Sequence, residues 1–233
     1  FRNLMSGDAG GAGLVSVANS ALFNSANSEY LSYTEQAGSS TTQQYISTWF
    51  YIGKAPTTTF PIWSCSDGTS SNREQLWLDS GSLLNFQSKI GGVAKAYWYS
   101  DAKFRDIGWY HFEVLLDTPN GTAASRLIVK VNNTEVSGTD STTFSASQAF
   151  GAIGTSGRTF AIAKTETTVY SDGYYAETVR IDGDPAGIST GEFDETGLYW
   201  TPKSSGSIKA LTFGTNGFYL DNTTNAQTDA SGE

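Results

Sequence analysis

The chain has 233 residues, of which 16% are charged and 13% aromatic, and its formal net charge is −9 at pH 7. Such an acidic chain, with no cluster of Lys or Arg along the sequence, repels phosphate backbones and anionic lipid, so nucleic acid and membranes are excluded as expected partners. The only cysteine, Cys65, and the only histidine, His111, exclude an intrachain disulfide and zinc sites of the Cys₄ and Cys₂His₂ kinds.

The composition also predicts the fold class. Aromatic residues, Ser, Thr and 25 glycines suit short strands joined by many turns, whereas amphipathic helices need periodic runs of Glu, Lys, Leu and Ala. The length fits one domain with a sizeable core. We therefore expect an all-β protein, an antiparallel β-sandwich or jelly roll with little helix.

Three segments follow one another along the chain. Residues 1–18 are rich in Gly and Ala, have no hydrophobic periodicity and lack the continuous apolar run of a signal peptide, so they predict an N-terminal arm. Residues 19–221 carry the strand patterns and predict the folded domain. Residues 222–233 are polar and predict a C-terminal tail.

The strands are predicted from alternating or continuous apolar runs that are bounded by turn residues. In chain order they are Ala21–Phe23, Tyr30–Tyr33, Gln44–Gly53, Ile62–Cys65, Gln75–Leu78, Leu83–Gln87, Val93–Tyr99, Gly108–Asp117, Arg126–Val131, Thr134–Val136, Phe150–Ile153, Arg158–Lys164, Gly173–Ile181, Leu198–Trp200, Leu211–Phe213 and Phe218–Leu220. The last three are short aromatic segments, which we expect to wrap around the sandwich.

The clearest alternation lies in Gly108–Asp117. Its even-numbered residues from Tyr110 to Leu116 are apolar and share one face, while the other face includes His111 and Glu113. This pattern predicts a half-buried strand, paired in a central hairpin with the alternating segment that follows the next turn. The earlier strand at 44–53 is apolar on both faces, which predicts that it lies between two covered layers.

The stretch Phe104–Val136 resembles LamG-like jelly rolls of the concanavalin A-like class. It contains Arg-Asp, then Trp-Tyr-His before a strand that ends in Asp-Thr, and the following strand leads into Asn-Asn where those proteins usually have Asn-Gly. Further stretches are similar to LamG-like proteins of marine bacteriophages, and the resemblance covers nearly the whole chain. They include Ser20–Tyr33, Asp172–Glu177, Gly191–Gly197 and Asn216–Leu220.

The resemblance implies a bacteriophage virion surface protein, such as a capsid decoration, a fibre or a tail appendage. As such it would form a homo-oligomer or join other virion proteins, and it would contact host or environmental polysaccharide. An alternative is a secreted or cell-surface carbohydrate-binding or adhesion module, which would be extracellular. A glycoside hydrolase or polysaccharide lyase is a third alternative, because one fold hosts many functions.

The resemblance also implies a Ca²⁺ site, because LamG modules often hold this ion at the rim of the sandwich with loop carboxylates and carbonyls. The candidate ligands are the aspartates at predicted strand ends: Asp79, Asp101, Asp172 and Asp182. The competing interpretation is that Asp is favoured in turns whether or not a metal is bound. No other cofactor is expected.

Sugar binding would use aromatic rings that stack on pyranose faces, with neighbouring polar groups for the hydroxyls. The candidates are Trp63, Tyr97, Trp98 and Tyr99, which are interleaved with Ser, Asp and Lys near predicted loops. The competing interpretation places these rings in the core, and we assign Trp49 and Trp109 to the framework of the fold.

Catalysis is not predicted. A retaining glycosidase on this fold alternates its carboxylates along one strand, but here Glu192 and Asp194 are followed by Glu195, which would face the opposite way. We expect a solvated turn in which Asp194 accepts hydrogen bonds from local N–H groups. His111 has no Ser or Cys partner at a recognisable elbow, so we expect it to be structural.

Overall fold

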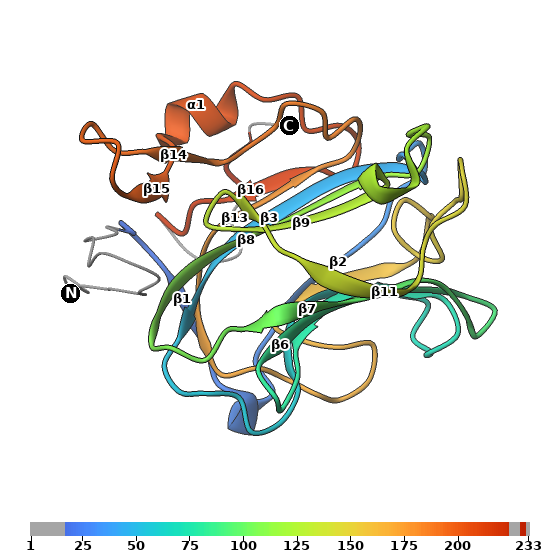
Figure 1. The fold of residues 1–233 in the computed structure, drawn as a ribbon, viewed down its shortest axis with the longest axis horizontal. Coiled ribbons are helices and arrows are strands. Elements are labelled where there is room, and N and C mark those ends of the chain that lie inside the picture. Colours follow the sequence, from blue (N-terminus) through green and yellow to red (C-terminus); the bar gives the residue numbers. More distant parts are fainter. Residues whose placement is uncertain (1–16, 224–228, 232–233) are drawn as a thin grey trace.

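The computed structural model describes residues 17–223 and 229–231. It is an antiparallel β-sandwich of two seven-stranded sheets, with a third sheet of two strands (Figure 1). Within these ranges the helical elements are α1 (Ser205–Lys209) and two 3-10 turns, Ser25–Asn27 and Ala123–Ser125, so the prediction of an all-β sandwich with little helix is confirmed. No described helix is long and apolar enough to cross a membrane. The predicted arm at 1–18 lies almost entirely outside the described residues.

We call the first sheet sheet A. Its strand order is β1 (Ala21–Phe23), β13 (Gly173–Ile181), β3 (Gln43–Ile52), β8 (Gly108–Asp117), β9 (Leu127–Val131) and β10 (Thr134–Glu135), with β16 (Phe218–Leu220) also paired to β13. The predicted hairpin is present, because β8 and β9 pair antiparallel next to the long central strand β3.

We call the second sheet sheet B. Its strand order is β11 (Gly138–Thr142), β7 (Val93–Lys103), β6 (Leu83–Ile90), β5 (Arg73–Leu78), β4 (Phe60–Ser66), β12 (Thr159–Ile162) and β2 (Leu31–Thr34). The main core lies between the two sheets and is rich in aromatic rings, such as Phe50 and Phe112 from sheet A and Phe86 from sheet B.

The segment after β13 covers the outer face of sheet A. It contains the two-stranded sheet of β14 (Gly191–Phe193) and β15 (Trp200–Pro202), followed by α1, and Figure 1 shows these elements on the side of sheet A that faces away from sheet B. Two further apolar clusters fill this layer, one around Tyr45 and Ile208 and one around Trp49 and Trp109. The prediction that the C-terminal aromatic segments wrap the sandwich is confirmed for Leu198–Trp200 and Leu211–Phe213, whereas Phe218–Leu220 is β16 and belongs to sheet A itself. Strand β3 is covered on both faces as expected.

The same layer corrects the expectation for β8, which is not half-buried. Its apolar face packs in the main core, and its other face, with His111 and Glu113, is buried beneath the C-terminal segment. Alternation alone could not reveal that the second face is buried, because polar residues on one face of a strand are also the pattern of a face exposed to solvent.

Several predicted strands are corrected as well. Phe150–Ile153 is a buried turn, because its backbone N–H groups donate to the carboxylate of Glu74 instead of to a neighbouring strand. Leu211–Phe213 follows α1 without forming a strand. The polar strand β11 was not predicted, since Gly, Thr, Asp and Ser do not form an apolar pattern. In the predicted tail, Ala230 N donates to Tyr219 O at 2.7 Å, so part of it lies against β16.

Candidate functional site

Three aromatic side chains lie on the outer face of sheet B: Trp77 on β5 and Tyr97 and Tyr99 on β7. Each is partly buried and belongs to none of the hydrophobic clusters, because strand alternation directs their neighbours inward and these rings outward. The rings of Trp77 and Tyr97 are nearly parallel, with an interplanar angle of 10° and centroids 6.4 Å apart, although β6 separates their strands. We call these three residues the aromatic strip.

Amide side chains lie between the rings of the strip. In the cross-strand register, Gln75 is opposite Gln87, which is opposite Tyr97, and Asn85 lies between Trp77 and Tyr99. Gln75 is only 7% exposed, and its side-chain Oε1 has no hydrogen-bond partner among the described residues. That oxygen is buried, so the amide that a ligand can reach is the partly exposed Gln87, whose Nε2 makes no hydrogen bond to a described residue. An amide donor beside aromatic rings is suited to a hydroxyl-bearing ligand.

A hairpin forms one side of the strip. It spans residues 164–170, is closed by a bridge between Lys164 and Tyr170, and is fixed to β4 by a hydrogen bond of 2.8 Å from Ser64 Oγ to Lys164 O. Its Glu166 forms an ion pair with Arg73 of β5, which also donates to Gln87 Oε1 at 2.8 Å. Burial lowers the pKa of Arg73, although the guanidinium remains charged at any ordinary pH.

Of the four residues predicted to bind sugar, the structure places two on the outer face of sheet B and two in the core. Tyr97 and Tyr99 lie in the aromatic strip, but Trp63 and Trp98 are corrected to core residues that are 2% and 6% exposed. Trp98 lies between the two tyrosines along β7, so alternation directs it inward. Trp77 was missed, although the alternation of Gln75 and Trp77 with two leucines in β5 was available in the sequence as a signal.

The four predicted calcium ligands do not lie together. Asp79 caps its own turn by accepting from Gly81 N and Leu83 N, and Asp172 accepts from the N–H of Ser25 at 2.7 Å. Asp182 accepts from Ser40 N, the Gln44 side chain and Asn216 N, while Asp101 is exposed on β7. Within the described ranges, no three His, Cys, Asp or Glu side chains are grouped so that they could hold a metal ion.

The carboxylates considered for catalysis belong to the small sheet over sheet A. Asp194 accepts from Leu198 N at 3.0 Å and from Tyr199 N at 3.1 Å, so it caps a turn as predicted. Glu192 and Glu195 are exposed on either side of it.

His111 is fully buried between sheet A and the C-terminal segment. Its ring stacks on Trp49 at 4.8 Å, its Nδ1 accepts from Trp200 Nε1 at 3.0 Å, and its Nε2 lies 3.0 Å from Thr190 Oγ1. Because the indole N–H can only donate, Nδ1 carries no proton and Nε2 donates to Thr190. Burial lowers the pKa of His111 to about 3, so the imidazole is neutral and the prediction of a structural histidine fits this geometry.

The buried carboxyl of Glu113 lies beside this ring. Its Oε1 accepts from Tyr45 OH at 2.7 Å and from Ser189 Oγ at 3.0 Å. Its Oε2 is 3.7 Å from His111 Nδ1 but forms no ion pair there, because the ring is neutral. Burial raises the pKa of Glu113. Of these contacts, the hydrogen bond from Ser189 joins sheet A to the segment that covers it.

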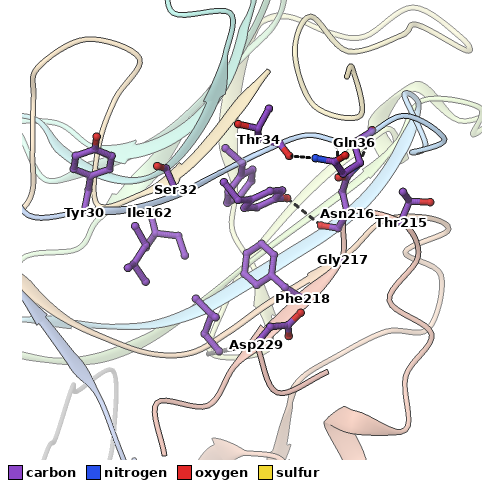
Figure 2. Close-up of a pocket in the computed structure, with 14 residues that line it drawn as sticks. Tyr30, Ser32, Thr34, Gln36, Ile162, Thr215, Asn216, Gly217, Phe218 and Asp229 are labelled. Carbon is purple, nitrogen blue, oxygen red and sulfur yellow. Dashed lines mark hydrogen bonds between the residues drawn. The ribbon is translucent and has the colours of Figure 1, made fainter. Parts of the chain in front are cut away.

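A groove of about 800 Å³ opens between β2 and β16, at the edge where the two sheets separate (Figure 2). Its floor is apolar, with Phe218 and Ile162 among the residues that Figure 2 shows pointing into it. Some polar groups on its rim bond to one another: Tyr33 OH donates to Asn216 O, and the side chain of Gln36 donates to Thr34 O. The hydroxyls of Ser32 and Thr34 also line the groove, belong to exposed side chains and form no hydrogen bond with a described residue.

No protein-family model matches the sequence, and no curated protein matches it. Solved structures do resemble the fold. Domains LG4–5 of the mouse laminin α1 chain align with a TM-score of 0.53 at 12% identity, covering 71% of this chain and 42% of that chain. A presumed carbohydrate-binding protein of Bacteroides ovatus aligns with a TM-score of 0.55 at 13% identity, covering 87% and 53%. This chain thus spans about half or less of those two proteins, and its fold is a concanavalin A-like, LamG-like sandwich.

Proposed function

We propose that this chain is a lectin-like protein that binds polysaccharide through the outer face of sheet B. The observation that carries the proposal is the nearly parallel pair of Trp77 and Tyr97 rings on a sheet face that the C-terminal segment leaves open. Aromatic faces stack on pyranose rings, and amide groups beside them bond to hydroxyls. The presumed carbohydrate binding of the Bacteroides ovatus neighbour is in keeping with this function.

The strip is a better candidate than the groove between β2 and β16 because it presents two nearly parallel aromatic rings, with polar side chains beside them. At the groove, rim groups such as Asn216 and Gln36 are already bonded to each other. At the strip, Gln87 Nε2 and the Tyr99 hydroxyl belong to partly exposed side chains and make no hydrogen bond to a described residue, whereas the unpartnered Gln75 Oε1 is buried. A sugar hydroxyl can both donate and accept, so it complements such a mixture.

The protein binds polysaccharide without cleaving it in this proposal. The acid and base roles of a glycosidase need two carboxyl groups that converge on one bond. Asp194 instead caps a turn, and the neighbouring glutamates are exposed beside it. His111 has both ring nitrogens engaged in hydrogen bonds.

The setting that we propose for this binding is the surface of a bacteriophage virion, with a secreted or cell-surface module as the alternative. The support is the sequence resemblance to LamG-like proteins of marine bacteriophages. In that setting the chain forms a homo-oligomer or joins other virion proteins. Mass spectrometry and immunogold labelling of purified particles test it: labelled particles are expected, and finding the protein only in culture medium would favour the secreted module.

Affinity electrophoresis in gels that contain single polysaccharides tests the binding. We expect retardation of the wild-type protein by at least one member of a panel of laminarin, xylan, galactomannan, agarose, κ-carrageenan and polygalacturonate. Trp77→Ala and Tyr97→Ala should each weaken that binding about tenfold, which corresponds to about 1.4 kcal/mol for the loss of an aromatic anchor.

The matched control for these variants is Tyr174→Ala. This tyrosine is 37% exposed on β13 of sheet A, so its loss removes an exposed aromatic ring from another face. Its binding should equal that of the wild type. Equal losses of affinity in all three variants would contradict the proposed site. So would an affinity that stays at the wild-type level in both Trp77→Ala and Tyr97→Ala.

A further inference from the structure

Three cationic side chains gather at one end of the aromatic strip, although they are distant in the sequence. Arg73 on β5 is directly opposite Lys89 on β6, and Lys95 lies beside Lys89 on β7, at a bulge where Ala94 and Lys95 together oppose Lys89. The sequence contains no Lys or Arg cluster, so pairing of the three strands creates this one. This cluster is a positively charged patch on a chain whose net charge is −9.

The two lysines supply the unpaired charge. Glu166 forms an ion pair with Arg73, but neither Lys89 nor Lys95 forms an ion pair with any described residue. Both are partly buried, so water screens them less than a fully exposed lysine. An uncompensated cation beside a stacking surface is complementary to an anion on the ligand.

The opposite end of the strip carries two carboxylates against one lysine, the exposed Lys103. Asp79 begins the turn that follows β5, and Asp101 is exposed on β7 two residues beyond Tyr99. A ligand with a negative group is therefore favoured at the Arg73 end and disfavoured at the Asp101 end. This asymmetry gives the bound saccharide a direction along the strip.

We propose that the ligand is an anionic polysaccharide, with its carboxylate or sulfate bound by Lys89 and Lys95 while the adjoining ring stacks on Trp77 and Tyr97. This inference rests on the proposed function and names the ligand class for the same face. Carboxylate and sulfate share the negative charge and the acceptor oxygens that an ammonium group requires.

Two matched pairs of polysaccharides test the charge. Polygalacturonate is compared with its methyl ester, and κ-carrageenan with agarose, so that the charge changes while the backbone stays closely similar. We expect the wild type to bind the charged member of at least one pair about tenfold more tightly, with the preference shrinking as NaCl is raised from 50 to 500 mM. The pair that shows the preference distinguishes carboxylate from sulfate.

The double variant Lys89→Gln/Lys95→Gln should lose this tenfold preference and keep the binding of the uncharged member. Lys103→Gln is the control, because it removes an exposed lysine from the far end of β7. It should keep the preference, and unchanged thermal midpoints would show that both variants fold.

The outcomes separate this inference from the proposed function. Equal binding of charged and uncharged polysaccharides that still depends on Trp77 would overturn the anionic ligand alone, as would a charge preference that survives in the double lysine variant. Failure to bind any polysaccharide would overturn both proposals.

Discussion

The two outer faces of the sandwich carry similar side chains in opposite settings. On sheet A, Trp49 stacks on His111 beneath the C-terminal segment, and the polar atoms there bond across the two layers. On sheet B, Trp77 and Tyr97 pair above amide groups, and hairpin 164–170 borders them on one side. An aromatic ring beside a polar group is thus a structural element where a layer covers it and a candidate recognition element where none does.

Of the tests for the two faces, substitution of a tryptophan on each should give the largest difference in the free energy of unfolding. Trp49→Ala should lower the free energy of unfolding by about 3–5 kcal/mol, because it leaves a cavity under the covering segment. Trp77→Ala should lower it by about 1 kcal/mol or less, since that ring packs in no core cluster. Urea denaturation of both variants measures the difference, and similar losses would contradict the assignment of one face to structure and the other to binding.

The pH dependence of stability tests the buried histidine. In the unfolded chain His111 takes up a proton near pH 6.5, but in the folded protein its pKa of about 3 keeps it neutral. Its contribution is therefore complete above pH 6.5 and is lost as the pH falls, by about 1.4 kcal/mol for each unit between 6.5 and 3.

Comparison with His111→Gln isolates this contribution. Glu35, Glu74 and Glu177 have pKa values raised by burial, which makes stability change in the opposite direction with pH, and these groups are common to both proteins. Denaturation curves at pH 5 and pH 7 should show that the wild type loses about 2 kcal/mol more than the variant. Equal losses would mean that His111 is protonated in the folded state.

Loss of one hydrogen bond should loosen the covering segment. Trp200→Phe keeps an aromatic ring but leaves His111 Nδ1 without its donor, which should cost about 1–3 kcal/mol. Hydrogen exchange should rise in β14 and β15 before it rises in β5 or β6. Uniform exchange across both sheets would show that the segment does not act as a separate layer.

The smallest effect is expected for Tyr97→Phe. The hydroxyl lies 3.5 Å from Asn85 Oδ1, a weak contact, so stability should stay within about 0.5 kcal/mol of the wild type. Polysaccharide affinity should change less than threefold, in contrast to Tyr97→Ala. If the Phe and Ala variants lose affinity equally, the hydroxyl and not the ring face is the contact, and the stacking argument fails.

Alternation in the sequence was sufficient for most of the strands and for two of the three residues of the strip. It predicted β8 and its hairpin with β9, and it contained the signal that separates Tyr97 and Tyr99 from Trp98. It could not tell a polar face in solvent from one under a second layer, because that depends on where residues 182–223 lie. The cationic end of the strip could not be predicted from the sequence either, because Arg73, Lys89 and Lys95 come together only through strand pairing.

The most direct measurement of the central claim is hydrogen exchange with and without the polysaccharide that retards the protein most strongly in the panel. The account predicts added protection in β5, β6 and β7 around Trp77, Gln87 and Tyr97, with no change at β2 and β16. Protection confined to β2 and β16 would assign binding to the groove of Figure 2 and contradict the account.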